Sequence, residues 1–101
     1  MMRILVVEDQ ADIRRLIRWS LEEGDYEIFE ATNGRMGLDA ARALRPDLVL
    51  LDVMMPGELD GFQVCTQLRA DPAHAALPIV MLTARAQEND RRAGELAAAS
   101  E

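Results

Sequence analysis

The chain has 101 residues, which is the size of one domain spanning residues 1–101, and half of them are hydrophobic, so it can bury a core. Its net charge of -7 argues against non-specific binding to nucleic acid or to anionic membranes. The single cysteine, Cys65, excludes a disulfide within the chain and suits a reducing compartment, so we expect a cytoplasmic protein. No apolar stretch approaches the length of a membrane span, so no membrane segment is expected.

Short apolar runs alternate with stretches of helical periodicity along the chain. The apolar runs predict strands over residues 4–7, 26–31, 47–52 and 78–82, the second of them more polar and therefore at a sheet edge. Helices are predicted between the strands, and a fourth helix from about residue 87 to residue 98. Because strands that alternate with helices form parallel sheets, we expect an α/β fold with a doubly wound parallel sheet.

The sequence also predicts where the helices begin and end. Asp9 or Asp12 is expected to cap the first helix, and Gly24 to end it. Asp60 is expected to cap the third helix. The apolar positions assigned to these helices are Ile13, Leu16, Ile17 and Leu21 in the first, and Phe62, Cys65 and Leu68 in the third. His74 is expected to be a solvated loop residue.

Three of the predicted strands end in polar side chains. Glu8 and Asp9 follow the first strand, Asp52 ends the third, and Thr83 follows the fourth. In a parallel sheet these ends meet at one edge, which is where α/β proteins bind ligands. Three carboxylates that converge there repel one another unless a cation neutralises them, and Mg²⁺ prefers such oxygen ligands. Beside such an ion, one carboxylate can act as a nucleophile toward a phosphoryl group.

Four short motifs carry a family resemblance. They read VVED at residues 6–9, LDVMMPG at 51–57, DGF at 60–62 and PIVMLTA at 78–84. In this order and at this spacing they resemble the receiver domain of bacterial two-component response regulators, of the kind found in chemotaxis regulators. The resemblance implies a flavodoxin-like sheet with strand order 2-1-3-4. It also implies Mg²⁺ as cofactor and a histidine kinase or phosphotransfer domain as phosphoryl donor.

Individual roles follow from the same resemblance. Asp52 corresponds to the phosphoacceptor, and Asp9, Asp52 and the main-chain carbonyl of Met54 correspond to direct Mg²⁺ ligands. Glu8 corresponds to an acid that reaches the metal through water. Thr83 corresponds to a switch hydroxyl that turns toward the phosphoryl group. The implied protein is no turnover enzyme; at most it phosphorylates itself and slowly loses the phosphoryl group.

Ala84 corresponds in the family to a small position beside the switch hydroxyl, where a large side chain would block access.

Two features depart from the family pattern. The loop over residues 56–61 is one residue longer than the commonest form, which a surface loop tolerates. Receivers also continue into a fifth strand with a lysine and then a fifth helix, whereas this sequence stops at Glu101 and contains no lysine.

The second departure leads to the expectation of a C-terminally truncated receiver that lacks the fifth strand and fifth helix. Its fourth strand would then be an exposed edge, through which the chain forms a homodimer or exchanges a strand. No output domain is expected, so this chain alone should not bind nucleic acid.

Several alternatives remain open from sequence alone. The first possibility is a phosphoacceptor. The second is a phosphorylation-silent dimerisation module, and the absence of the lysine favours this second possibility. A Mg²⁺-dependent phosphohydrolase is a third possibility, but such enzymes want an acid where this chain has Met54. Asp52 and Thr83 could also be ordinary helix-capping or turn residues. Arg14, Arg15 and Arg18 are interpreted as a solvated helix face, with contact to a kinase as the alternative.

Overall fold

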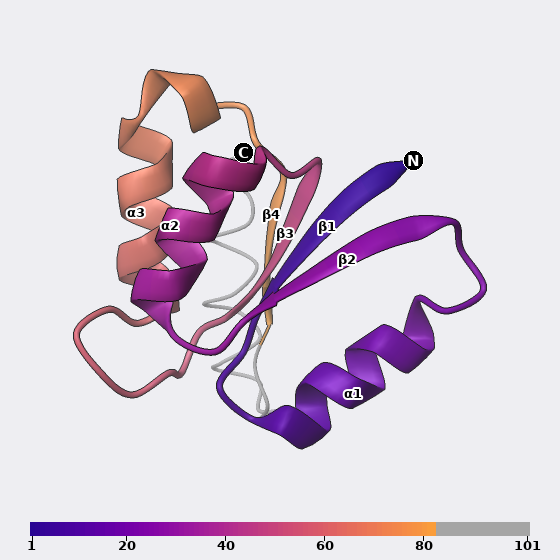
Figure 1. The fold of residues 1–101 in the computed structure, drawn as a ribbon. Coiled ribbons are helices and arrows are strands. Elements are labelled where there is room, and N and C mark those ends of the chain that lie inside the picture. Colours follow the sequence, from indigo (N-terminus) through magenta and orange to yellow (C-terminus); the bar gives the residue numbers. More distant parts are fainter. Residues whose placement is uncertain (83–101) are drawn as a thin grey trace.

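The computed structural model describes residues 1–82, which form a parallel sheet flanked by helices (Figure 1). The elements, in chain order, are β1 (Met2–Val7), α1 (Ala11–Ser20), β2 (Tyr26–Ala31), α2 (Gly34–Leu44), β3 (Leu48–Asp52), α3 (Gly61–Ala70), the short 3₁₀ helix η1 (Pro72–His74) and β4 (Ile79–Leu82). All four predicted strands are therefore present. The helix predicted for residues 87–98 lies outside the described residues.

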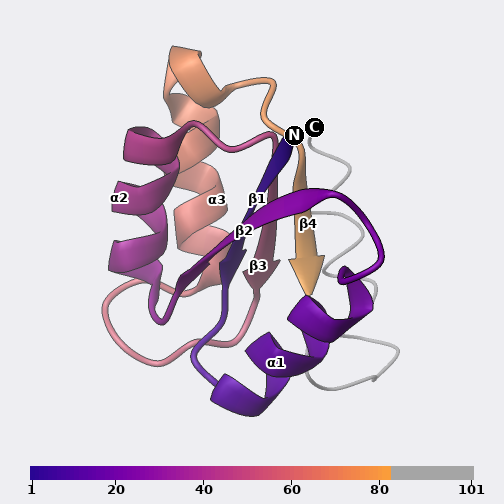
Figure 2. The same ribbon diagram turned by 45° about the vertical axis from the view of Figure 1, so that its right-hand side comes forward.

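The strands are parallel and lie in the order β2-β1-β3-β4, as expected (Figures 1 and 2). β1 is thus an interior strand, with Val7 paired to Ala31 of β2 and to Leu51 of β3. β2 lies at an edge, which agrees with its more polar sequence. Because β1 and β3 are direct neighbours, the acidic residues that follow or end these two strands meet at one edge of the sheet.

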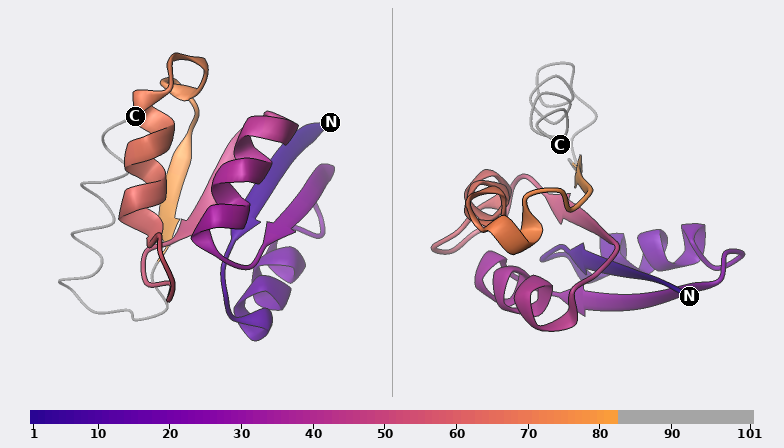
Figure 3. Two further views of the ribbon diagram at one scale, coloured as in Figure 1. Left: turned by 60° about the vertical axis from the view of Figure 1, so that its left-hand side comes forward. Right: turned by 90° about the horizontal axis from the view of Figure 1, so that it is seen from above.

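Helices lie on both faces of the sheet, with α2 and α3 on one side and α1 on the other (Figure 3). The hydrophobic core fills the side that α2 and α3 cover, because alternate side chains of a strand point to the same face. Helix residues that complete this core are Leu38, Ala41, Val64, Cys65 and Leu68. Phe62 was expected to join them, but it is 38% exposed, so that prediction is wrong.

The starts of α2 and α3 are fixed by side-chain caps, and the predicted cap at Asp60 is confirmed. Asn33 Oδ1 accepts a hydrogen bond from the Met36 amide at 2.8 Å, which fixes the start of α2. Asp60 and Gln63 form a reciprocal capping box at the start of α3. Arg45 ends α2 in the left-handed conformation, with φ of 50°, directly before Pro46.

Helix α1 differs from the expectation in several ways. Its N-cap residue is Gln10, whose side chain makes no capping bond, so neither Asp9 nor Asp12 caps the helix. The helix ends at Ser20, earlier than the predicted stop at Gly24. None of its residues is buried, and Leu16 is 57% exposed. The helix is instead tied to the sheet by ion pairs between its arginines and an acid of β2.

His74 is buried rather than solvated, which corrects the sequence-based expectation. Its Nε2 lies 3.3 Å from the carbonyl oxygen of Ala41 in α2, and its Nδ1 lies 3.3 Å from Asp71 Oδ2. The reason is that η1 folds the chain back against the end of α2 after α3 has stopped. Within residues 1–82, no helix is long and apolar enough to cross a bilayer.

Candidate functional site

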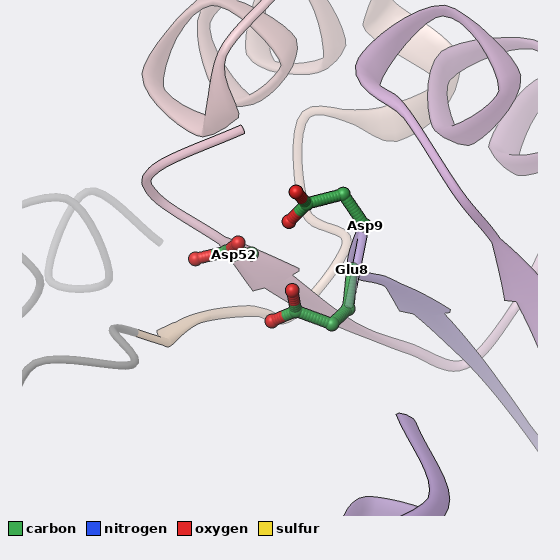
Figure 4. A group of neighbouring side chains, drawn as sticks. All are labelled: Glu8, Asp9 and Asp52. Carbon is green, nitrogen blue, oxygen red and sulfur yellow. The ribbon is translucent and has the colours of Figure 1, made fainter. Parts of the chain in front are cut away.

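Three carboxylates gather at the carboxyl ends of β1 and β3. Glu8 and Asp9 directly follow β1, and Asp52 is the last residue of β3. One carboxylate oxygen from each lies within 4.8 Å of the others, and Figure 4 shows the three side chains grouped at this edge. Glu8 and Asp52 are each only 1% exposed. The predicted convergence of these acids is therefore present in the fold.

Asp52 is fixed by the turn that follows it and by α3. Its Oδ1 accepts a hydrogen bond from the Met54 amide at 3.1 Å. The Val53 amide continues the sheet by donating to Leu82 at 2.8 Å, and the Gly61 amide donates to the Val53 carbonyl at 3.1 Å. A β-carbon at Gly61 would lie 2.1 Å from the Asp52 carbonyl oxygen, so only glycine allows α3 to start this close.

Glu8 is fixed from three directions. Its amide donates to the Ala31 carbonyl at 3.0 Å, which extends the pairing of β1 with β2. Its Oε2 accepts from the Gln10 amide at 3.0 Å. Its main-chain carbonyl accepts from Arg14 Nη1 at 2.8 Å. The site therefore depends on α1 as well as on the strands.

Arg14 is the part of this arrangement that the sequence did not predict. It was interpreted as part of a solvated face, but its side chain is only 17% exposed. Its Nε donates to Glu30 Oε1 of β2 at 2.9 Å, and Arg18 pairs with the other oxygen of the same carboxylate. The only signal in the sequence was an arginine on α1 together with an acid on the edge strand, and sequence alone does not pair them.

Burial changes the acid strength of the group. Removal from water, helped by the neighbouring Asp9 and Asp52, raises the pKa of Glu8 from an ordinary 4.5 to about 7. The hydrogen bond from the Gln10 amide works in the opposite direction and lowers it. Burial likewise raises the pKa of Asp52, with the charge of Asp9 adding to the effect. Three negative charges that are buried close together raise the free energy of the fully ionised state. The arrangement therefore favours the binding of a cation.

One oxygen is left without a partner among residues 1–82: Oδ1 of Asp9 is buried and accepts no hydrogen bond. A buried carboxylate oxygen normally has a donor or a metal beside it. The donor set of three carboxylates is all oxygen, which suits a hard divalent cation better than a thiolate- or imidazole-seeking metal. The residues present therefore fit such an ion.

The remaining predicted site residues lie at or beyond the edge of this group. Met54 has a half-exposed side chain, and its amide is the donor that holds the Asp52 carboxylate. Thr83 and Ala84 lie outside the described residues.

Comparison with known proteins agrees with this geometry. The family model for the response regulator receiver domain matches residues 4–101. The chain is 48% identical over 92 residues to the transcriptional regulatory protein ResD of Bacillus subtilis, a match that covers 91% of this chain. It is 42% identical over 94 residues to the DNA-binding dual master transcriptional regulator RpaA of Synechocystis, covering 93% of this chain. The chain spans 37% of the length of ResD and 39% of RpaA.

Solved structures show the same fold. A putative response regulator from Chloroflexus aurantiacus superposes with a TM-score of 0.86 at 31% identity, covering 95% of this chain and 78% of that one. The N-terminal domain of a response regulator receiver protein from Methanoculleus marisnigri gives a TM-score of 0.81 at 35% identity, covering 96% and 78%. The flavodoxin-like architecture expected from the sequence is therefore confirmed.

Proposed function

Because this chain belongs to the response regulator receiver family, we propose that Asp52 accepts a phosphoryl group from a phosphohistidine with Mg²⁺ bound beside it. The observation that carries the proposal is the cluster of three carboxylates at the ends of β1 and β3. Asp52 is the member of this cluster on the central strand β3, with its carboxylate held by the Met54 amide. The proposed unit of function is a receiver domain over residues 1–101.

Asp9, Asp52 and the main-chain carbonyl of Met54 are the proposed Mg²⁺ ligands, with Glu8 acting through water. The buried Asp9 oxygen, which has no partner within residues 1–82, and the all-oxygen donor set support this assignment. When bound, Mg²⁺ would neutralise the acids and the charge on the oxygens of the transferring phosphoryl group.

Asp52 supplies the nucleophile. One of its carboxylate oxygens forms a bond to phosphorus as the bond from phosphorus to the donor imidazole nitrogen breaks, and the imidazole leaves with that electron pair. The Met54 amide restricts rotation of the carboxylate, so that it needs little reorganisation on attack. Thr83 is the proposed switch hydroxyl and Ala84 the small residue beside it, both by family resemblance.

We expect the aspartyl phosphate to last long enough to act as a signal, and we do not expect the chain to hydrolyse phosphate esters repeatedly as an enzyme would. The position two residues after Asp52 is Met54, whose thioether cannot transfer protons to or from a leaving group or water. A hydrolase that uses an aspartyl nucleophile would need such a group. Burial of Asp52 also limits the access of water.

The proposed partners are a histidine kinase or phosphotransfer domain, and the proposed place of action is the cytoplasm. The curated relatives are named as transcriptional regulators, but this chain spans well under half of their length. Nucleic-acid binding is therefore no part of the function proposed for residues 1–101. Self-association through β4 is a further proposal, since within residues 1–82 this strand pairs only with β3.

The proposed function is tested by incubating the protein with a small acyl phosphate and MgCl₂ and measuring its intact mass. A mass gain of one phosphoryl group that is absent from Asp52→Asn and abolished by a chelator supports the proposal. Asp39→Asn is the matched control, because Asp39 is an exposed acid on α2 and should not change the result. No mass gain in the folded wild-type protein would refute it.

A further inference from the structure

Arg14 of α1 joins the helix to two other parts of the fold. Its Nη1 donates to the main-chain carbonyl of Glu8 at 2.8 Å, and its Nε donates to Glu30 Oε1 at 2.9 Å. An arginine on a helix surface normally keeps its charged end in water. Here the guanidinium is engaged at two points and the side chain is only 17% exposed.

The carbonyl that Arg14 holds belongs to the peptide bond between Glu8 and Asp9. A peptide unit is planar, so a bond to this oxygen fixes the orientation of the whole unit and with it the start of Asp9. Glu8 is also held through its amide and its carboxylate, but neither of those bonds involves an atom of the peptide unit that leads into Asp9. Asp9 itself has a buried Oδ1 that no donor within residues 1–82 holds.

We infer that Arg14 is a positioning residue for the acidic cluster. By fixing the peptide unit between Glu8 and Asp9, it keeps the Asp9 carboxylate beside Asp52 and thereby strengthens the binding of a divalent cation. The inference rests on the proposed function, because it concerns the same Mg²⁺ site.

Glu30 of β2 holds Arg14 in place from the other side. The carboxylate lies between Arg18 and Arg14, and hydrogen bonds from these arginines lower the pKa of Glu30, so it stays ionised at neutral pH. In the register of the sheet Glu30 pairs with Val6, two residues before Glu8. The guanidinium fork of arginine can reach Glu30 and the Glu8 carbonyl at once, which a lysine ammonium could not do with the same geometry.

A purely structural role is the competing explanation. No residue of α1 is buried, so apolar packing holds this helix only weakly. The ion pairs of Arg14 and Arg18 with Glu30 attach the helix to the sheet. Arg18 separates the two explanations, because it bonds the same carboxylate, while the hydrogen bond to the Glu8 carbonyl comes from Arg14. Loss of helix docking should affect both arginine variants, whereas loss of positioning should affect only Arg14.

The test compares Arg14→Ala, Arg14→Lys and Arg18→Ala in the full chain by titrating MgCl₂ and following amide chemical shifts. Outer-shell partners of metal ligands typically contribute about 10–100-fold in affinity. We expect Arg14→Ala to bind Mg²⁺ about 10-fold more weakly, Arg14→Lys to fall between it and wild type, and Arg18→Ala to stay within about twofold of wild type.

Equal losses in Arg14→Ala and Arg18→Ala, or no loss in Arg14→Ala, would overturn the inference. If Arg14→Ala does not fold, Arg14→Lys decides, and wild-type affinity in that variant overturns the inference. Failure of the proposed Mg²⁺ site gives a different result, since wild-type protein would then show no saturable Mg²⁺ shifts at Asp9 and Asp52, and failure of phosphoryl transfer is read separately from the intact mass. If the wild type binds Mg²⁺ and the arginine variants bind it with the same affinity, only the role of Arg14 is contradicted.

Discussion

The carbonyl oxygen of Asp52 lies where a side chain on Gly61 would have to be, 2.1 Å from an ideal β-carbon position. The first turn of α3 therefore packs directly against the end of β3. The contact also lets the Gly61 amide bond to the Val53 carbonyl at 3.1 Å. The start of α3 and the proposed phosphoacceptor are therefore built as one unit.

Gly61→Ala should disturb this unit. The added methyl group meets main-chain atoms that cannot rotate away, so the chain must shift, at a cost of about 1–3 kcal/mol. We expect a lower urea midpoint together with slower phosphorylation of Asp52. Gly57→Ala is the matched control in the same loop. Gly57 has φ of 106° and nothing within 4 Å of its β-carbon position, so alanine there should cost stability through strain but spare phosphorylation. Equal rates in Gly61→Ala and wild type would contradict the coupling.

The acidic cluster should make stability depend on pH. Burial raises the pKa of Glu8 to about 7, so between about 4.5 and 7 the folded state holds a proton that the unfolded chain releases. A raised folded-state pKa gives stability that is full below the unfolded value and is lost as pH rises through the folded value. Without Mg²⁺, the free energy of unfolding should therefore fall between about pH 4.5 and pH 8, by on the order of 3 kcal/mol from Glu8.

Glu8→Gln isolates this effect, because glutamine keeps the acceptor for the Gln10 amide but cannot ionise. Denaturant unfolding at several pH values gives the free energy of unfolding of both proteins. This free energy should depend less steeply on pH in Glu8→Gln than in the wild type. Added Mg²⁺ should stabilise the wild type more at pH 8 than at pH 5, since a cation favours the ionised acids. A wild-type slope identical to that of Glu8→Gln would show that Glu8 is not the titrating group.

Elements whose signals are local were predictable from the sequence. The apolar runs indicated all four strands, and Asp60 caps α3 as expected, because capping needs only near neighbours. The meeting of Asp52 with Glu8 and Asp9 followed from the parallel sheet that the alternation of strands and helices predicts, and the family resemblance supplied the strand order.

The errors lie where residues distant in sequence decide the outcome. Asp9 joins the acidic cluster as expected but does not cap α1, because Gln10 takes the cap position. Arg14 was expected in solvent, but an acid on β2 draws it against the sheet. His74 was expected in solvent because its neighbours are loop residues, whereas η1 packs it against α2.

The buried position of His74 gives a further prediction. His74→Ala removes a buried ring that lies within 3.3 Å of the Ala41 carbonyl, and should lower the free energy of unfolding by about 1–3 kcal/mol. Ala75→Ser is the control, because Ala75 is exposed next to it and substitutions at such sites stay within about 0.5 kcal/mol. Urea unfolding of both variants provides the measurement. An effect of His74→Ala as small as that of Ala75→Ser would mean that the ring is solvated.

The chemical identity of the phosphorylated residue tests the central claim most directly. Borohydride reduces an aspartyl phosphate to homoserine, so phosphorylated protein can be reduced, digested and read by tandem mass spectrometry. The three-carboxylate site predicts homoserine at position 52 and nowhere else, and only when Mg²⁺ was present during phosphorylation. Homoserine at position 9, phosphate retained on a serine or threonine, or labelling of Asp52 that does not need a divalent cation would contradict the proposed site.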